Sequence, residues 1–492
     1  MRAVSAERRA RAAGEAADRA ASPPEKYLRC LWYDGRRFLK RGIRTRDGAR
    51  IEIVSPGAWN TGRGPDFLGG VFRLDGRATV CGDVEVHRRR RDWAAHAHRR
   101  DPAFGGVRLH VFLLDDGRRD CCRNHLGDPV TELCLRGQTR RPAEEAARLI
   151  DPRDYPYRAG GARGRCGAVA GAGGGERLAV LLRLAGKERL RVKIARARRL
   201  ARRHGREQAL YLLILETLGY SAHKGAFRRL SRLLPWRTLR RIAAHAGPRD
   251  AHAAVETALL GAAGLIPPSA APAWDRETQR AWRAAKRGWR LIETSRGVGG
   301  MDPAVWRGGA QRPASAPPRR LAAAGVLFAR CAKKGLVRTL LPRGRGAVPG
   351  ALERRLARLL DGAPRSYWDL RCAWGGRRLR RPCAPIGPEH RVKIVANVLL
   401  PFLHLEGQRA AARAVFESLP AVEPDSCVKA MMARLVGGGT PFPRRWGFAA
   451  QQGLLCLHRR LCVKDRSGCR RCRLPGLLRG GAGEARRMTG LT

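Results

Sequence analysis

The sequence has no run of eighteen or more apolar residues, so it predicts no membrane-spanning helix. Residues 1–24 lack the apolar centre of a secretory signal, and Glu7, Glu15 and Asp18 interrupt the composition typical of a transit peptide. The 14 cysteines are too few and too scattered over 492 residues for a disulfide scaffold. We therefore expect a protein of the reducing cytoplasm, whose first 24 residues form a polar extension.

Three common catalytic motifs are also missing. The sequence contains no G-x-x-x-x-G-K-[ST], no G-x-S-x-G and no H-E-x-x-H. The corresponding phosphate loop, nucleophile elbow and zinc-protease helix are therefore not expected. The glycine-rich segment 159–175 follows no strand at the spacing of a phosphate loop, and its composition is typical of a linker.

Acidic residues are scarce: 42 Asp and Glu stand against 99 Lys and Arg, which gives a net charge of +57. A surplus of this size is typical of proteins that bind polyanions, and we predict nucleic acid as the partner. Of the 99 basic residues, 88 are arginine and 11 are lysine. A GC-rich genome would also produce this bias, so codon usage is the alternative explanation.

The pattern of apolar residues changes once along the chain. Alternating residues before residue 158 indicate strands, and helical spacing from residue 176 onward indicates a series of helices. We predict an α+β protein with a mixed sheet flanked by helices, followed by a large all-helical region. The predicted divisions are a polar extension (1–24), an α/β domain (25–158), a linker (159–175), a helical domain (176–450), a cysteine-rich segment (451–480) and a tail (481–492). The sequence does not indicate an oligomeric state.

The predicted α/β domain begins with a helix, three strands, a helix and a strand. These segments are a helix at 25–40 broken near Asp34-Gly35, strands at 51–54, 66–74 and 78–87 with a tight turn at Asp75-Gly76, a helix at 91–100, and strands at 107–114 and 131–135.

Two acidic positions stand out in this domain. Asp66 follows Gly64-Pro65, and Glu85 lies in the alternating segment 83–87. Because successive side chains of a strand point to opposite faces, Asp83, Glu85 and His87 share one face. If Asp66 lies beside that face, two carboxylates, a backbone carbonyl and an imidazole can hold a divalent cation and a water. The pattern alone also fits a solvated polar face of a strand.

Three further histidines lie near His87 in the sequence. His96 and His98 are two residues apart and would face different ways on a helix, so we expect at most one to point at the site. His98 and Asp101 can face together, whereas His110 lies in an apolar strand, where a core histidine is the commoner role. The accessory candidates are therefore Asp83, His96, His98, Asp101 and His110.

The order of elements, with Asp66 on the second strand and Glu85-Val86-His87 on the third, resembles the PD-(D/E)XK nuclease core, a restriction-endonuclease-like fold. The resemblance implies that Asp66 and Glu85 hold Mg²⁺ or Mn²⁺ together with the carbonyl of Val86. It also implies that His87 polarises the attacking water, although those nucleases carry Lys at this position. An unperturbed imidazole would titrate near neutrality, and a more histidine-rich ligand set would favour Mn²⁺ or Zn²⁺.

Short motifs spread over the chain are shared with one bacterial family. They are Trp32; Pro56-Gly57, Asn60 and Gly64-Pro65-Asp66-Phe67; Gly82 to His87; Asp92-Trp93, His96, His98 and Asp101; Leu109-His110-Val111; Glu188-Arg189; Leu218-Gly219-Tyr220; Leu260-Gly261, Ala263-Gly264; Arg312-Pro313, Pro317 and Arg320; Tyr367-Trp368; Asn397, Pro401-Phe402; and Gln452-Gly453. From about Tyr27 to Leu478 the chain thus resembles the domain-of-unknown-function 2851 family, with Ser315 in place of the family's Asn. The resemblance implies an α/β N-terminal part and a helical remainder, without an established activity.

A cysteine cluster lies near the end of the chain. Cys456, Cys462, Cys469 and Cys472 form C-x₅-C-x₆-C-x₂-C with His458 inside it. This spacing predicts a metal site, and structural zinc is the first alternative. The C-x₆-C-x₂-C part resembles the iron–sulfur loop of some DNA glycosylases, but Leu478 stands where the fourth cysteine is expected, so Cys456 or His458 would substitute. Reduced cysteines without a metal are the third alternative.

Together these features predict a metal-dependent nuclease. Asp66 and Glu85 would bind the cation, His87 would orient or deprotonate water, and the arginine surplus would hold the backbone of the nucleic acid. One alternative is a non-catalytic nucleic-acid-binding or scaffold protein on a degenerate nuclease fold. Another is a histidine-based metal hydrolase with a small-molecule substrate.

Overall fold

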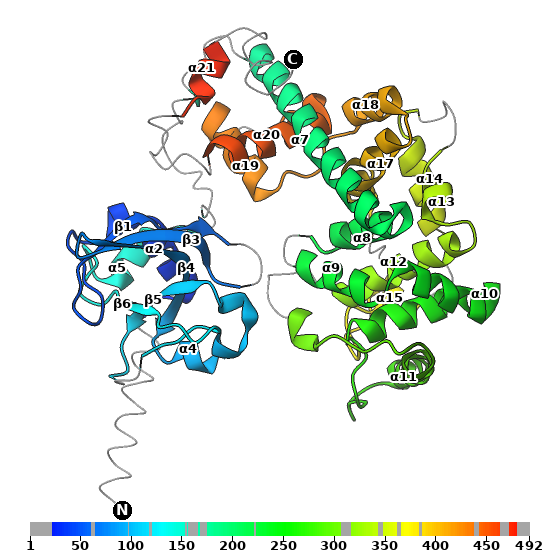
Figure 1. Cartoon of the computed structure of the whole chain (residues 1–492), viewed down its shortest axis with the longest axis horizontal. Coiled ribbons are helices and arrows are strands. Elements are labelled where there is room, and N and C mark those ends of the chain that lie inside the picture. Colours follow the sequence, from blue (N-terminus) through cyan, green and yellow to red (C-terminus); the bar gives the residue numbers. More distant parts are fainter. Residues whose placement is uncertain are drawn as a thin grey trace, which may run out of the picture. The chain divides into compact units, whose positions relative to one another are not determined.

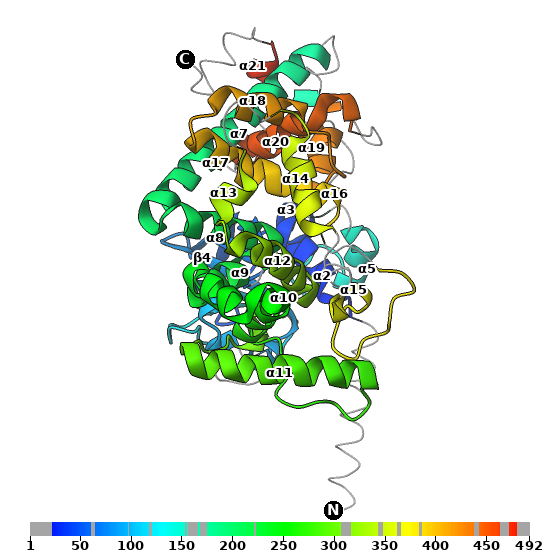
Figure 2. The same ribbon diagram turned by 90° about the vertical axis from the view of Figure 1, so that its right-hand side faces the viewer.

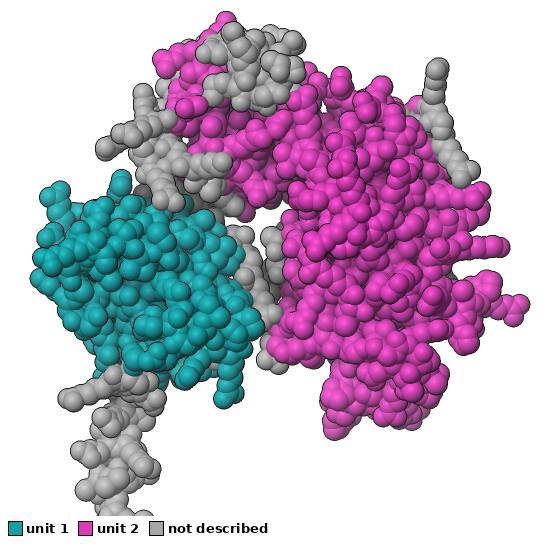
Figure 3. Space-filling view, viewed as in Figure 1, with its two compact units in different colours: residues 1–162 teal, residues 163–492 magenta. Residues whose placement is uncertain are grey.

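The computed structural model divides into two compact units, unit 1 (residues 1–162) and unit 2 (residues 163–492) (Figures 1 and 3). The residues described are 22–60, 64–96, 98–117, 121–152, 155, 166–167, 175–220, 223–306, 316–342, 348–361, 366–382, 386–436, 442–462 and 472–479. The division falls inside the predicted linker 159–175, of which residues 166–167 and 175 alone are described. The predicted polar extension and C-terminal tail lie outside the described residues, except for positions 22–24.

Unit 1 is built on a six-stranded mixed sheet. Its strands are β1 (Ile51–Ser55), β2 (Ala58–Trp59), β3 (Phe67–Leu74), β4 (Ala78–Arg89), β5 (Val107–Leu114) and β6 (Thr131–Cys134). The strand order is β1-β3-β4-β5-β6, and β2 also pairs with β3. The β1–β3, β2–β3 and β3–β4 pairs are antiparallel, whereas the β4–β5 and β5–β6 pairs are parallel. The sequence predicted all of them except β2, which at two residues is too short to show alternation.

The β3–β4 hairpin positions the predicted carboxylates. Asp75 and Gly76 both have positive φ, at 47° and 72°, which is the conformation of a type I′ turn. Phe67 pairs with Val84 in the resulting register, so Asp66 and Glu85, the next residues outward, become neighbours. A tight turn therefore brings together two acids that are nineteen positions apart in the sequence.

Two helices cover one face of this sheet. They are α2 (Glu25–Tyr33) and α5 (Ala143–Arg148), and α3 (Gly35–Phe38) follows α2 directly after the predicted break at Asp34. Val84 and Val86 point into this core, where they join apolar residues of α2, β5, β6 and α5. The two valines therefore lie on the face opposite that of Glu85 and His87, as the alternation of strand side chains requires.

The opposite face is covered by shorter elements: α4 (Asp92–Ala95), η1 (His98–Arg100) and η2 (Pro102–Phe104). Trp93, Phe104, Val107 and Val130 form a second small apolar cluster there. Because both faces are covered, the polar face of β4 is buried as well. The single helix predicted at 91–100 is wrong, since the α-helix ends at Ala95 and the chain continues as a 3₁₀ turn from His98.

The regular elements of unit 2 are all helical among its described residues, as the sequence predicted, and the whole chain is α+β. Its main helices are α7 (Gly175–His204), α8 (Arg206–Leu218), α9 (Lys224–Leu233), α10 (Trp236–Ala262), α11 (Arg276–Arg296), α12 (Pro317–Ala332), α13 (Leu336–Leu340), α14 (Ala351–Leu360), α15 (Tyr367–Leu370), α16 (Pro388–Ile394), α17 (Leu400–Leu405), α18 (Arg409–Ser418), α19 (Ser426–Val436), α20 (Gly447–Leu457) and α21 (Leu474–Arg479), with π-helical turns η6 (Val395–Leu399) and η8 (His458–Cys462). Figure 2 shows α11 as a long helix below α10, against which it packs. None of the described helices is both long and apolar enough to cross a membrane.

Two glycines let α7 and α20 cross with their backbones in contact. A Cβ atom on Gly186 would lie 2.1 Å from the carbonyl oxygen of Ala449, and one on Gly453 would lie 2.0 Å from that of Leu182. Both distances are far inside van der Waals contact, so each position requires glycine. The side chains that flank these glycines are thereby pressed against the neighbouring helix.

Candidate metal centre

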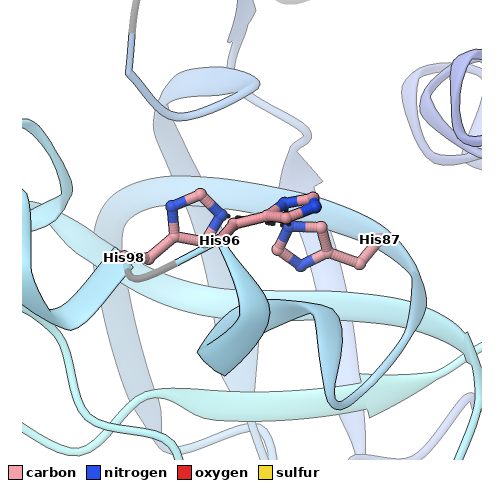
Figure 4. A group of neighbouring side chains, drawn as sticks. All are labelled: His87, His96 and His98. Carbon is pink, nitrogen blue, oxygen red and sulfur yellow. Dashed lines mark hydrogen bonds between the residues drawn. The ribbon is translucent and has the colours of Figure 1, made fainter. Parts of the chain in front are cut away.

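Three histidine side chains meet on the polar face of β4 (Figure 4). His87 Nε2 lies 3.1 Å from His98 Nε2 and 3.2 Å from His96 Nδ1. They come from β4, from the end of α4 and from η1, and their ligand atoms all lie within 4.8 Å of one another. The expectation that at most one of His96 and His98 points at the site is wrong, because the helix ends at Ala95, before both residues. His87 and His98 are buried, whereas His96 is exposed.

His87 Nε2 has more polar neighbours than hydrogen bonds can satisfy. Its other ring nitrogen, Nδ1, lies 2.9 Å from His110 Nε2. In either tautomer, Nε2 offers one lone pair or one proton. It nevertheless faces His96 Nδ1, His98 Nε2 and, at 3.6 Å, Glu85 Oε1. A cation placed among these atoms would satisfy all of them.

The spacing of these atoms fits a bound metal ion. Zinc–nitrogen bonds place neighbouring ligand atoms roughly 3.3 Å apart in a tetrahedral site, and roughly 3.0 Å apart in an octahedral one. The nitrogen pairs at 3.1 and 3.2 Å agree with these values, as does the 3.4 Å between Glu85 Oε1 and His98 Nε2. The three imidazoles and Glu85 therefore form a donor set suited to a divalent transition metal.

The two predicted carboxylates are neighbours, but they serve different contacts. The Asp66 N–H donates to Glu85 Oε2 at 2.9 Å, and the Val86 N–H donates to Asp66 Oδ2 at 3.1 Å. Arg29 Nη2 lies 2.9 Å from the other oxygen, Asp66 Oδ1. Both oxygens of Asp66 are therefore engaged away from the imidazoles, and Glu85 Oε1 is the carboxylate oxygen that faces them.

Burial controls the ionisation of this cluster. Burial, and then the neighbouring imidazoles, hold the pKa of His87 well below its ordinary value, and the same causes lower the pKa of His98 to about 4. Titration of His87 near neutrality, as expected from the sequence, is therefore wrong. Burial, and next the charge of Asp66, raise the pKa of Glu85. His87 and His98 are thus neutral donors, as metal ligands must be.

A second polar row extends from His87 across the parallel strands. Glu85 pairs with His110 in the β4–β5 register, and His110 pairs with Glu132 in the β5–β6 register. His110 Nδ1 lies 3.8 Å from Glu132 Oε1 and 3.8 Å from Cys122 Sγ. His110 is thus the outer partner of His87, which fixes the orientation of that imidazole. The expectation that His110 is a hydrogen-bonded core histidine agrees with these contacts.

Glu132 and Cys122 were not predicted as site residues. With His110, they form another group whose ligand atoms lie within 4.8 Å. Arg90 donates to both oxygens of Glu132, at 2.6 and 3.1 Å, and this guanidinium would repel a cation. Burial raises the pKa of Glu132, but hydrogen bonds from His110, Arg90 and Cys122 outweigh it and lower the pKa to about 2. We therefore interpret the group of His110, Cys122 and Glu132 as a support for the three-histidine centre and not as a second metal site.

The two remaining acidic candidates bind nearby backbone. Asp83 Oδ1 accepts a hydrogen bond from the Gly69 N–H at 2.9 Å, and Asp101 Oδ1 accepts one from the Ala103 N–H at 3.0 Å. Asp83 therefore binds the neighbouring strand β3, where the strand register shifts between Phe67 and Gly70, and Asp101 caps η2.

The cysteine cluster of unit 2 is described in part. Cys456 is buried in α20, His458 and Cys462 lie in η8, and Cys472 precedes α21, whereas Cys469 lies outside the described residues. Cys462 Sγ lies 3.7 Å from the sulfur of Met431. Among the residues that the structure describes, no three ligand atoms of this cluster come within 4.8 Å of one another. Its zinc, iron–sulfur and metal-free alternatives stay predictions.

Fold and side chains define an α+β protein with a histidine-rich candidate metal centre on a mixed sheet. Residues 25–423 match the family described as protein of unknown function (DUF2851), and the chain belongs to this family, as its motifs indicated. No curated protein and no solved structure matches the chain. The resemblance to the PD-(D/E)XK nucleases stays a prediction.

Proposed function

We propose that this protein is a metal-dependent hydrolase that cleaves phosphodiester bonds of nucleic acid, with its metal ion held by His87, His96 and His98. The observation that carries the proposal is the convergence of three imidazole nitrogens within 4.8 Å of one another, with Glu85 Oε1 3.6 Å from His87 Nε2 and 3.4 Å from His98 Nε2. Hydrogen bonds alone cannot satisfy all the polar atoms that face His87 Nε2. A divalent cation supplies the positive charge that both Glu85 and the imidazole lone pairs require.

The donor set favours Zn²⁺ or Mn²⁺ over Mg²⁺. Imidazole nitrogen suits transition metals, whereas Mg²⁺ requires oxygen ligands and retains several waters. Glu85 Oε1 completes the set on the buried side, and His96 marks the side that is open to solvent. When bound, such an ion polarises a phosphoryl oxygen and lowers the pKa of a water molecule to near neutrality.

The remaining residues position these ligands. Asp66, held by Arg29 and by the Val86 N–H, directs its own N–H at Glu85 Oε2 and so orients Glu85 Oε1 toward the imidazoles. This role differs from the metal-ligand role that the nuclease resemblance implies for Asp66. His110 contacts His87 Nδ1 and leaves Nε2 to face the metal position.

Charge supports nucleic acid as the substrate. The chain carries a net charge of +57, and the exposed Arg99 and Arg100 directly follow His98 in η1. Arginines at the rim of a metal centre suit the phosphates that flank a scissile bond.

Burial favours a second candidate function, the hydrolysis of a small phosphodiester. His87 is fully buried and Glu85 is 5% exposed, so the ligands lie beneath the surface. A small substrate or the end of a single strand reaches such a position more readily than an intact duplex.

Metal content and turnover test the proposal. The His98→Gln variant, purified without a histidine tag, should contain one Zn²⁺ or Mn²⁺ per chain less than the wild type. The control His125→Gln changes a histidine outside the cluster and should contain as much metal as the wild type. The comparison between variants matters, because the cysteine cluster can hold a second ion. Equal metal content in His98→Gln and the wild type would refute the site.

Turnover is then measured with duplex DNA, single-stranded DNA, RNA and bis-p-nitrophenyl phosphate. Cleavage of any nucleic acid by the metal-loaded wild type supports the proposal, and cleavage of the small ester alone selects the second candidate. A metal-loaded protein that cleaves none of these substrates contradicts both and leaves a binding or scaffold role.

A further inference from the structure

The crossing of α7 and α20 in unit 2 gathers two cationic side chains around one neutral oxygen. Arg189 Nε donates to Gln452 Oε1 at 2.9 Å, and Lys193 Nζ donates to the same oxygen at 2.8 Å. The two cations are one helical turn apart on α7, and Gln452 is buried at 6% exposure. Gly453, the next residue of α20, makes the close backbone contact that presses Gln452 against them.

Further positive charge surrounds this pair. Burial, followed by the charges of Arg189 and Lys224, lowers the pKa of Lys193 well below its ordinary value. Arg459, in η8, acts in the same direction on both Arg189 and Lys224. Two helices, α7 and α9, and the π-helical turn η8 therefore bring four cations into electrostatic range of Arg189 or Lys193.

The acids in range are already engaged. Glu216 binds Arg196 at 2.5 Å and Arg228 at 2.9 Å. Asp425 Oδ1 accepts a hydrogen bond from the Val428 N–H at 2.9 Å. Within the described residues, the hydrogen-bond acceptor that Arg189 and Lys193 share is therefore a neutral amide. Asp425 and Glu216 act on Arg189 and Lys224 through space, but a neutral amide cannot balance the two cations that share it, so the site favours an anion.

We propose that Arg189 and Lys193, held in place by Gln452, form a phosphate-binding site, to which Lys224 and Arg459 add positive charge. A guanidinium presents paired N–H donors to phosphate oxygens, and ammonium groups add compact charge. The phosphate belongs either to a small phosphorylated molecule or to the backbone of a nucleic acid. The proposal does not rest on the hydrolase activity, because binding is measured without turnover.

Binding of inorganic phosphate is the first test. Calorimetric titration at constant ionic strength should show binding to the wild-type chain and at least tenfold weaker binding to Lys193→Ala. The matched control is Arg202→Ala, an exposed arginine nine residues farther along α7 and therefore on the opposite side of the helix. Equal phosphate affinity in Lys193→Ala and Arg202→Ala, or no binding to the wild type, would overturn the proposal.

The source of the phosphate is decided by a competitor. If a single-stranded oligonucleotide displaces inorganic phosphate, and does so in Arg202→Ala but not in Lys193→Ala, the site takes backbone phosphate. If phosphate binds and the oligonucleotide does not compete, the site takes a small phosphorylated molecule.

Gln452→Glu separates a binding role from a structural one. The substitution keeps Oε1 and adds a fixed negative charge between Arg189 and Lys193. We expect phosphate affinity to fall at least tenfold, while the midpoint of thermal unfolding rises by several degrees. A lower midpoint, or unchanged phosphate affinity, would show that the cations do not lack an anion.

Discussion

Unit 1 carries 33 basic and 22 acidic residues, a net charge of +11, whereas unit 2 carries 66 and 20, a net charge of +46. Their buried polar clusters differ in the same direction. In unit 1, two imidazoles and Glu85 Oε1 surround His87 Nε2, and a cation would satisfy them. In unit 2, Arg189 and Lys193 share the amide oxygen of Gln452, and the missing charge is negative. The two proposals therefore assign ligands of opposite charge to the two units.

Metal removal should have the largest effect on this contrast. Dialysis against a chelator should reduce phosphodiester hydrolysis by roughly 1,000-fold or more, since the ion supplies most of the charge stabilisation at the reacting phosphate. Zn²⁺ or Mn²⁺ should restore the rate, whereas Mg²⁺ should not. Phosphate binding in unit 2 should be unchanged by the same treatment. Full activity in the chelator would contradict the assignment of a cation to unit 1.

Gly453→Ala should break the contact that assembles the cationic cluster of unit 2. The added methyl group would lie 2.0 Å from a backbone oxygen, and separating the helices should cost about 3 kcal/mol of unfolding free energy. Denaturant unfolding measures this change. The control is Gly225→Ala in α9, where the Cβ meets nothing within 4 Å, and this substitution should stabilise the helix by about 0.5–1 kcal/mol. Equal free energies of unfolding for the two variants would contradict the close backbone contact between Gly453 and Leu182.

The pH dependence of stability tests another buried group of unit 2, the carboxyl of Glu256. Ser366 Oγ donates to its two oxygens at 3.2 and 3.0 Å, but burial outweighs this contact and raises its pKa to about 7. The folded state therefore binds the proton more tightly than the unfolded state does. Its contribution to stability is complete below pH 4.5 and is lost as the pH rises through 7.

Glu256→Gln removes this titration. Relative to the wild type, the variant should gain stability between pH 4.5 and pH 8 by no more than about 3 kcal/mol. Denaturant unfolding at a series of pH values measures the difference. The side chain is 15% exposed, and this residual exposure reduces the gain. A difference between the two proteins that is constant with pH would show that Glu256 ionises normally in the fold.

Glu132→Gln should have the smallest effect, because Glu132 acts on the metal position through His110 and His87. Loss of the carboxylate at the end of this row should weaken metal binding about tenfold. Competition with a metal-sensitive dye measures the affinity. Glu52→Gln, which alters an exposed pair with Arg73, is the matched control and should leave the affinity unchanged. A loss of metal affinity as large as that caused by His98→Gln would indicate that Glu132 binds the metal directly.

The sequence predicted unit 1 well wherever local chemistry decides the structure. Alternation in 78–87, the Asp75-Gly76 turn and the break at Asp34 are short-range signals, and each corresponds to an observed element. The approach of Asp66 to Glu85 follows from the hairpin register, which these signals determine. Glu132 could also have been predicted as a site residue, because it lies inside the predicted strand 131–135 and pairs with His110 on the neighbouring strand.

The histidine geometry could not be derived from helical periodicity. The pattern of 91–100 is compatible with a continuous helix, on which His96 and His98 diverge. In the structure the helix stops at Ala95, and the Asp101 cap begins another short turn. The cluster of Arg189, Lys193 and Gln452 was harder still to predict, since Gln452 lies more than 250 residues from the other two and meets them through a helix crossing.

The three histidines of the candidate centre lie within a twelve-residue stretch, from His87 to His98. Closing so short a loop costs little chain entropy, so the stretch can hold a metal ion before the sheet is complete. An ion that also binds the unfolded chain stabilises the native state by less than its affinity for the native state indicates. The benefit of the short loop is kinetic: an ion captured early can align β4 with the residues that follow it while the chain is still folding.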